Sequence, residues 1–250
     1  MDRFTRLEFG DTAPKKRPDG ETIRNAEYFY KEAYKYWFAA DYELALRNFS
    51  RVLEENSSVF GAWSGQIVSL IELREYPEAI MWADKALEYF PEHPELLALK
   101  AVAYSRDAKF EKAIAFSDNS VMKNDVTPRV WLARAEVLLN RKSSVAENCI
   151  SKAISSAGEQ GPVIKLEAAR LLKRKHKYTQ AIEYLNEVIQ AVPKSALVWY
   201  ELGCCQAELG LAQAKVSFEQ CCNLSPDWDE AKRRLKRVKN QGFFRRLFRG

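Results

Sequence analysis

The chain has 250 residues, of which 47% are hydrophobic and 29% are charged, and its formal net charge is +5. This hydrophobic fraction allows a substantial core and excludes a chain that is disordered throughout. Glycines are few, at 10, and alternating β-branched segments are rare, so the composition argues against a β-sheet protein.

The N-terminal arm, residues 1–25, contains no apolar run long enough for a secretory signal or a membrane span. We therefore expect a cytoplasmic protein. Residues 13–20 are rich in proline and charge, which is typical of a flexible segment. Phe4, Leu7 and Phe9 could instead cover the first helix of the folded part, and both interpretations stay open.

From residue 26 onward the chain is organised by an internal repeat. Its clearest copy is the amphipathic segment Glu75 to Pro91, in which Ala79, Ala83 and Ala86 share one helix face. Equivalent alanines recur at intervals of 33 to 35 residues: Ala45, Ala79, Ala113, Ala146, Ala181 and Ala214. A second helix precedes each of these, with small residues at its centre: Ala33, Ala101, Ala135, Ala169 and Gly203.

This order of aromatic, small and helix-stopping residues resembles the tetratricopeptide repeat family, from about Ala26 to Trp228. Two copies depart from the family pattern, with Ile67 at a usually small position and Lys165 at a usually aromatic one. The resemblance implies an all-α, right-handed superhelical solenoid of six helix-turn-helix repeats. We expect them at residues 26–59, 60–93, 94–127, 128–161, 162–195 and 196–228.

The last 22 residues carry nine lysines and arginines against two acids, a net charge of +7, which leaves −2 for the rest of the chain. Trp228, Ala231, Leu235 and Val238 would share one stripe, which predicts a basic capping helix at residues 229–241 over the sixth repeat. We expect Gly242 to end this helix.

Residues 242–250 would form an amphipathic docking tail if they were helical. At 100° per residue, the apolar side chains would lie within one arc of about 140° around the helix, and the basic side chains would lie on the opposite side. The apolar set is Phe243, Phe244, Leu247 and Phe248, and the basic set is Arg245, Arg246 and Arg249. An anionic membrane surface and a protein groove, including that of a second copy, both remain open as partners.

Sequence motifs of enzymes and metal sites are missing: there is no HExxH, no phosphate-binding glycine loop and no GxGxxG. His93 and His176 fall in polar turns, where histidines are usually solvated. The five cysteines lie in helical positions that favour packing over metal or disulfide chemistry. We therefore predict no catalytic residue, no metal site and no cofactor.

Without a catalytic or metal site, we expect the protein to act by binding a partner on its surface. In the resembling family the first helices of the repeats line a concave groove that binds ligands. The family positions map here to Tyr30, Tyr34, Trp37, Val68, Ile71, Arg170, Lys173 and Arg174. These residues could equally fill the narrow inner side by packing. Family members that clamp a chaperone carboxylate use a lysine and an asparagine where Tyr30 and Tyr34 stand, so a cochaperone is disfavoured.

The sequence thus predicts a non-enzymatic protein-interaction scaffold for an apolar or aromatic partner that carries acidic residues. One alternative is a nucleic-acid-associated protein that uses the basic C-terminus. Lys232 to Lys239 contains no aromatic residue for base stacking, so only nonspecific phosphate attraction is supported. The other alternative is a non-catalytic subunit of an enzyme complex.

Overall fold

The computed structural model of the chain describes the backbone of residues 25–139 and 145–247 and the side chains of these residues up to 240. The predicted arm therefore lies outside the described residues, apart from Asn25. So does the turn between Asn140 and Ser144. The described residues form thirteen α-helices and one 3₁₀ turn and no strand, which confirms the predicted all-α solenoid.

Twelve of the helices form six consecutive pairs. The first (A) helices are α1 (Ala26–Phe38), α3 (Phe60–Glu72), α5 (Pro94–Arg106), α7 (Pro128–Leu139), α9 (Gly161–Arg174) and α11 (Ala196–Glu208). The second (B) helices are α2 (Tyr42–Glu55), α4 (Tyr76–Tyr89), α6 (Phe110–Val121), α8 (Val145–Ser155), α10 (Tyr178–Ala191) and α12 (Ala214–Leu224). The 3₁₀ turn η1 (Gly158–Gln160) precedes α9, and α13 (Asp229–Leu247) follows α12.

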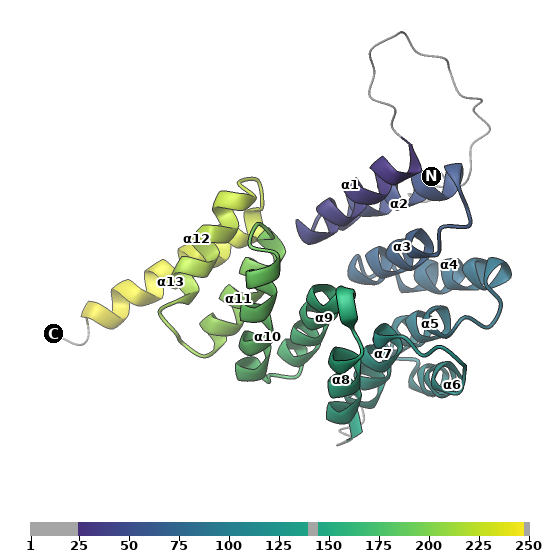
Figure 1. The fold of residues 1–250 in the computed structure, drawn as a ribbon. Helices are drawn as coiled ribbons and strands as arrows, with labels where there is room; N and C mark the ends of the chain where they lie inside the picture. The colour runs from purple at the N-terminus through teal and green to yellow at the C-terminus, as the bar shows by residue number, and fades with distance from the viewer. Residues whose placement is uncertain (1–24, 140–144, 248–250) are drawn as a thin grey trace, which may run out of the picture.

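The helix pairs stack into a curved array that bends back on itself (Figure 1). The A helices from α3 to α11 contact one another in sequence, and α1 contacts α11. At that contact the hydroxyl of Ser195 donates a hydrogen bond of 3.1 Å to the carbonyl oxygen of Phe38. Because Ser195 is the N-cap residue of α11, the first and sixth helix pairs touch, although 157 residues separate the two bonded groups.

Small residues allow close packing between neighbouring helices. The six anchor alanines predicted from the repeat are all fully buried. At Gly203 a Cβ atom would lie 2.9 Å from the ring of Phe218, so no larger residue fits there without movement. Ile67 breaks the small-residue pattern in the second repeat and is nevertheless fully buried. Gly65, on the same helix, leaves the space for the ring of Phe49.

Each A helix that is followed by a described turn ends in the same way, with one residue at positive φ. These residues are Ala40, Arg74, Ala108, His176 and Gly210, with φ between 58° and 68°. In the first turn, the amide of Ala40 bonds the carbonyl of Trp37, and the amide of Asp41 bonds that of Tyr36. This is the Schellman arrangement, which satisfies the last carbonyl groups of the helix.

The C-terminal helix α13 covers the sixth repeat with its first half. Ala231 is fully buried, and Leu235 and Val238 pack beside Phe218. We expected Gly242 to end the helix, but α13 continues through it to Leu247, so that prediction is wrong. One glycine in a helix costs only about 1 kcal/mol relative to alanine, which an already nucleated helix can absorb. None of the described helices is long and apolar enough to cross a bilayer.

The repeated turn yields a stability prediction for a pair of opposite substitutions. Ala108 is exposed and has φ of 58°, a conformation that is strained for alanine and free for glycine. We expect Ala108→Gly to stabilise the fold by roughly 0.5–1 kcal/mol and Gly210→Ala to destabilise it by about as much. Urea unfolding midpoints measure both changes. Equal shifts in the same direction would contradict the assigned turn geometry.

Candidate binding cleft on the inner face

A layer of ion pairs crosses the inner face and joins five of the six A helices. It contains five carboxylates and five cations. They are Glu72 on α3, Glu95 and Arg106 on α5, Arg129 and Glu136 on α7, Glu167, Arg170, Lys173 and Arg174 on α9, and Glu201 on α11. We call this set the ionic layer. Its formal charges balance when every member is ionised.

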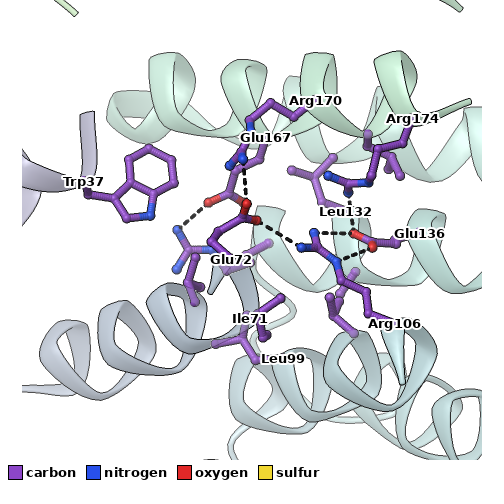
Figure 2. Close-up of a pocket in the computed structure, with 15 residues that line it drawn as sticks. Trp37, Ile71, Glu72, Leu99, Arg106, Leu132, Glu136, Glu167, Arg170 and Arg174 are labelled. Atoms are coloured by element: carbon purple, nitrogen blue, oxygen red, sulfur yellow. Dashed lines mark hydrogen bonds and ion pairs between the residues drawn. The ribbon is translucent and has the colours of Figure 1, made fainter. Parts of the chain in front are cut away.

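Arg106 is the centre of the layer, between two glutamates (Figure 2). Its Nε and one terminal nitrogen bind the two oxygens of Glu136 at 2.8 and 3.3 Å, which is the strong bidentate geometry. Its other terminal nitrogen binds Glu72 at 3.1 Å. Glu136 also accepts a bond of 2.8 Å from Arg174. One arginine thereby connects α3, α5 and α7.

Arg170 carries the layer to the far end of the array. It binds Glu72 at 2.5 Å and, through Nε, Glu201 at 2.9 Å. Lys173 also donates to Glu201. Because Glu72 and Arg170 are 98 residues apart, their ion pair ties the second repeat to the fifth. Together with the bond between Ser195 and Phe38, it holds the array in its closed curve.

A second branch of the layer is centred on Arg129. Its terminal nitrogens bind Glu95 at 3.0 Å and Glu167 at 3.1 Å, and Thr127 donates a further bond to Glu95. The Nε of Arg129 is buried and has no hydrogen-bond partner among the described residues. This branch connects α5, α7 and α9 nearer to their first turns.

The pairing sets the pKa values of the glutamates. Burial opposes the charge of Glu72, but Arg170 and Arg106 outweigh it and hold the pKa of Glu72 at about 2. The pKa values of Glu136 and Glu201 are lowered for the same reason, by their arginine and lysine neighbours against the effect of burial. The pKa of Glu167 is raised, because burial and nearby Glu95 together exceed the attraction of Arg129.

The ionic layer lies between two spaces. On one side is a pocket of about 60 Å³, the inner pocket, with apolar walls that include Trp37, Val68 and Leu132. On the other side is an open cleft of about 560 Å³, the outer cleft. Its lining brings six cations together with two carboxylates: Arg74, Arg106, Arg170, Lys173, Arg174 and Lys175, with Glu72 and Glu136.

Positive charge therefore predominates in the outer cleft. Glu201 lies behind the lining and pairs with two of its cations, which leaves three positive charges in excess. Aromatic side chains from the B helices complete the wall, including Tyr76 and Phe110, and Phe110 is 46% exposed. A cleft of one sign with low-dielectric walls concentrates its field on a ligand of the opposite sign. The arrangement suits an acidic ligand with an apolar or aromatic part.

The residues predicted for a groove divide into two groups. Trp37 and Ile71 are almost completely buried, at 3% and 2% exposure, and border the inner pocket together with Val68. Tyr30 and Tyr34 pack edge to face, each against Phe49 as well. Four of the predicted residues, Ile71, Arg170, Lys173 and Arg174, line the outer cleft. The predicted aromatic residues Tyr30, Tyr34 and Trp37 do not line it.

The cysteines and histidines take packing and capping positions. Burial raises the pKa of Cys204 to about 11 and those of Cys205 and Cys221 to about 12, so these thiols are protonated and weakly nucleophilic at neutral pH. His93 does not lie free in solvent as its turn position indicated. Its ring stacks on Phe60 at 4.0 Å between centroids, and its Nδ1 accepts from the amide of Glu95 at the start of α5.

A family model described as tetratricopeptide repeat matches residues 30–94 and 166–215, which lie in the first, second, fifth and sixth helix pairs. The chain is a tetratricopeptide-repeat protein. Proteins with these repeats bind protein or peptide partners and are generally non-catalytic scaffolds.

Among curated proteins, this tetratricopeptide-repeat chain is similar to the human protein IFIT1 homolog B, with 30% identity over 142 residues. The match covers 53% of this chain but only 30% of the relative. Among solved structures, the human IFIT1 dimer with m7Gppp-AAAA has a TM-score of 0.54 at 19% identity, covering 91% of this chain and 59% of that one. TTC0263, a tetratricopeptide-repeat protein from Thermus thermophilus, has a TM-score of 0.53 at 16% identity, covering 73% and 99%.

The ionic layer makes the stability of this tetratricopeptide-repeat protein dependent on pH. Three of its glutamates, Glu72, Glu136 and Glu201, have lowered pKa values. Their contribution to stability is complete above the ordinary glutamate range and is lost as pH falls through the lowered values, which for Glu72 is about 2. Glu167, with a raised pKa, acts in the opposite direction and offsets only part of this. We expect the urea midpoint to fall progressively below about pH 5.

The Glu72→Gln variant isolates the source of this effect. At neutral pH it should lose roughly 3–5 kcal/mol, since it leaves two buried arginines incompletely paired, and its midpoint should vary less between about pH 5 and pH 3. Glu54→Gln, at an exposed position on α2, is the matched control and should behave as the parent chain. A parent chain with the same midpoint at both pH values would contradict the assignment.

Proposed function

We propose that this protein is a non-enzymatic interaction scaffold that captures an acidic, partly aromatic segment of a protein partner in the outer cleft. The observation that carries the proposal is the excess of cations in that cleft, contributed by separate turns and helices of the second, third and fifth repeats. Such residues come together only when the array is curved. The outer cleft has a volume of about 560 Å³, which lies within the range of ligand-binding pockets, about 300–1,000 Å³.

Two features support a peptide over a small ion. The cations are spread over the wall of an open cleft, so several carboxylates can be engaged along an extended segment. Tyr76 and the exposed Phe110 border the same cleft and offer apolar contacts beside the charges. Aromatic anchors next to arginines are the usual composition of strong binding sites in protein interfaces.

Binding of a fluorescein-labelled peptide in which glutamates flank a phenylalanine tests the proposal. We expect saturable binding that weakens with salt, and a loss of at least about tenfold in affinity for Arg74→Glu, which reverses the charge at the cleft rim. The control variant Lys194→Glu makes the same charge change at an exposed site that does not line the cleft. A glutamine version of the peptide that bound equally well would contradict an acidic partner.

A second candidate is RNA, which is favoured by the similarity to IFIT1. Structures of that protein contain m7Gppp-AAAA or PPP-AAAA, and the outer cleft of this chain offers cations beside aromatic rings. The same assay with both oligonucleotides separates the candidates. Binding of either oligonucleotide in physiological salt, tighter than that of the peptide and lost in Arg74→Glu, would make RNA the ligand of the cleft.

For the C-terminus, we propose that α13 attaches the scaffold to an anionic membrane surface. Its first half is fixed to the sixth repeat by Ala231, Leu235 and Val238, while five cations of that half are exposed: Lys232, Arg233, Lys236, Arg237 and Lys239. The helix backbone continues to Leu247, so this part of the predicted docking tail extends an existing helix and needs no new nucleation. Each cation near an anionic surface contributes about 1 kcal/mol.

Co-sedimentation with vesicles tests this attachment. The full chain should pellet with anionic vesicles at low salt, remain in solution with neutral ones, and lose binding in the double variant Phe243→Ser with Phe244→Ser. Met81→Ser, at an exposed apolar residue on α4, is the control and should bind normally. A full chain that stays in solution with anionic vesicles would exclude the membrane and direct the search to a protein groove.

A further inference from the structure

The two carboxylates that line the outer cleft, Glu72 and Glu136, separate it from the inner pocket. Both also line the inner pocket, as do Arg106, Arg170 and Arg174. A partner carboxylate that entered the cleft, as the proposed function requires, would therefore meet arginines that already hold a carboxylate from within the chain. The inference below rests on that proposed function.

The helix dipoles favour two of the arginines at their positions and disfavour the two glutamates at theirs. Arg106 and Arg174 are the last residues of α5 and α9, where the helix dipole favours a cation. Glu72 is the last residue of α3, and Glu136 lies in the last turn of α7, where the dipole disfavours an anion. The cations are thus well placed without their partners, whereas the glutamates are held in place by the arginines.

The three arginines also differ in the number of ion pairs that they form and in their exposure to solvent. Arg106 uses three nitrogens for its two glutamates and is 19% exposed. Arg174 makes one ion pair, with Glu136, and its side chain is 35% exposed. Arg170 is nearly buried, but the pair that it forms with Glu72 is the one that spans the curve of the array. The accessible end of the layer is therefore at Arg174, and its structural tie is at Arg170.

We propose that Glu72 and Glu136 are in-chain substitutes for the carboxylates of the partner, and that the partner binds by displacing them, first from Arg174 and then from Arg170. Rim cations such as Arg74 receive the acidic segment, and exchange then proceeds inward through the layer. Displacement of Glu72 breaks the link between α3 and α9. Binding therefore loosens the closure of the array, and the resting chain limits its own affinity for acidic ligands.

The test measures the affinity of the labelled acidic peptide for the full-length variants Glu136→Gln and Glu72→Gln. Removing an internal competitor increases the fraction of competent sites, so we expect binding about tenfold tighter than that of the parent chain, together with a lower melting temperature. Glu54→Gln, which removes the same charge from an exposed position outside the layer, should leave affinity unchanged. Unchanged or weaker binding in Glu136→Gln would overturn the proposal.

A measurement on the unaltered chain covers the case in which Glu72→Gln fails to fold. With saturating peptide, amide hydrogen exchange in the last turn of α1 and the first turn of α11 should accelerate, because these segments meet where the array closes. Slower exchange there would mean that the ligand tightens the closure, and the proposal would be wrong. If the peptide binds and exchange becomes slower, the proposed binding function is kept and the displacement of the glutamates is rejected. If no peptide binds, both proposals are rejected.

Discussion

The structure depends on small residues that let neighbouring helices approach closely. Gly203 of α11 faces the ring of Phe218 within the sixth pair, and Gly65 of α3 faces the ring of Phe49 across the first and second pairs. The anchor alanines of the B helices are likewise fully buried. Since a helix pair covers only its neighbours, such close contacts along the array set its curvature.

Crowding on the inner side explains why charges are buried there. Five A helices converge, and side chains long enough to cross the space between them meet in its middle. Arginine and glutamate can satisfy one another across that distance, whereas a single unpaired charge would be too costly to bury. A buried ion pair adds little net stability over apolar packing, but it fixes which residues oppose one another. The ionic layer thus fixes which A helices of distant repeats face each other across the inner side of the curve.

Much of the fold could be predicted from sequence because its signals are local. The anchor alanines, the aromatic positions and the turn residues recur at a nearly constant interval, and each acts within its own helix pair. The departure at Ile67 was visible, but the close approach of the Phe49 ring to Gly65 on the same helix was not, since it depends on packing between two helix pairs. The end of the capping helix was misjudged at Gly242 because a local helix breaker was weighed without the stabilising contacts of the preceding residues.

The binding cleft was predicted less well, for a physical reason. Arg170, Lys173 and Arg174 were identified through their position on the first helix of their repeat, and they do line the cleft. Arg74 and Arg106 were not, since they come from the ends of α3 and α5 and join the site only through curvature. Lys175, which caps the end of α9, was not identified either. A weak signal existed in the charges at equivalent A-helix ends, Glu72, Arg106 and Arg174, which recur at multiples of the repeat. Which of them pair cannot be read from periodicity, because the pairing crosses several repeats.

The bond between Ser195 and Phe38 has a consequence for how the protein comes apart. In an open row of repeats the terminal units have only one neighbour, so they fray first and unfolding proceeds inward from the ends. Here the first and sixth repeats are each other's second neighbour across the closure. Each end is therefore protected by the opposite end, and loss of either one removes support from both. A chain built from local units thereby acquires a long-range cooperativity that its repeat pattern alone would not provide.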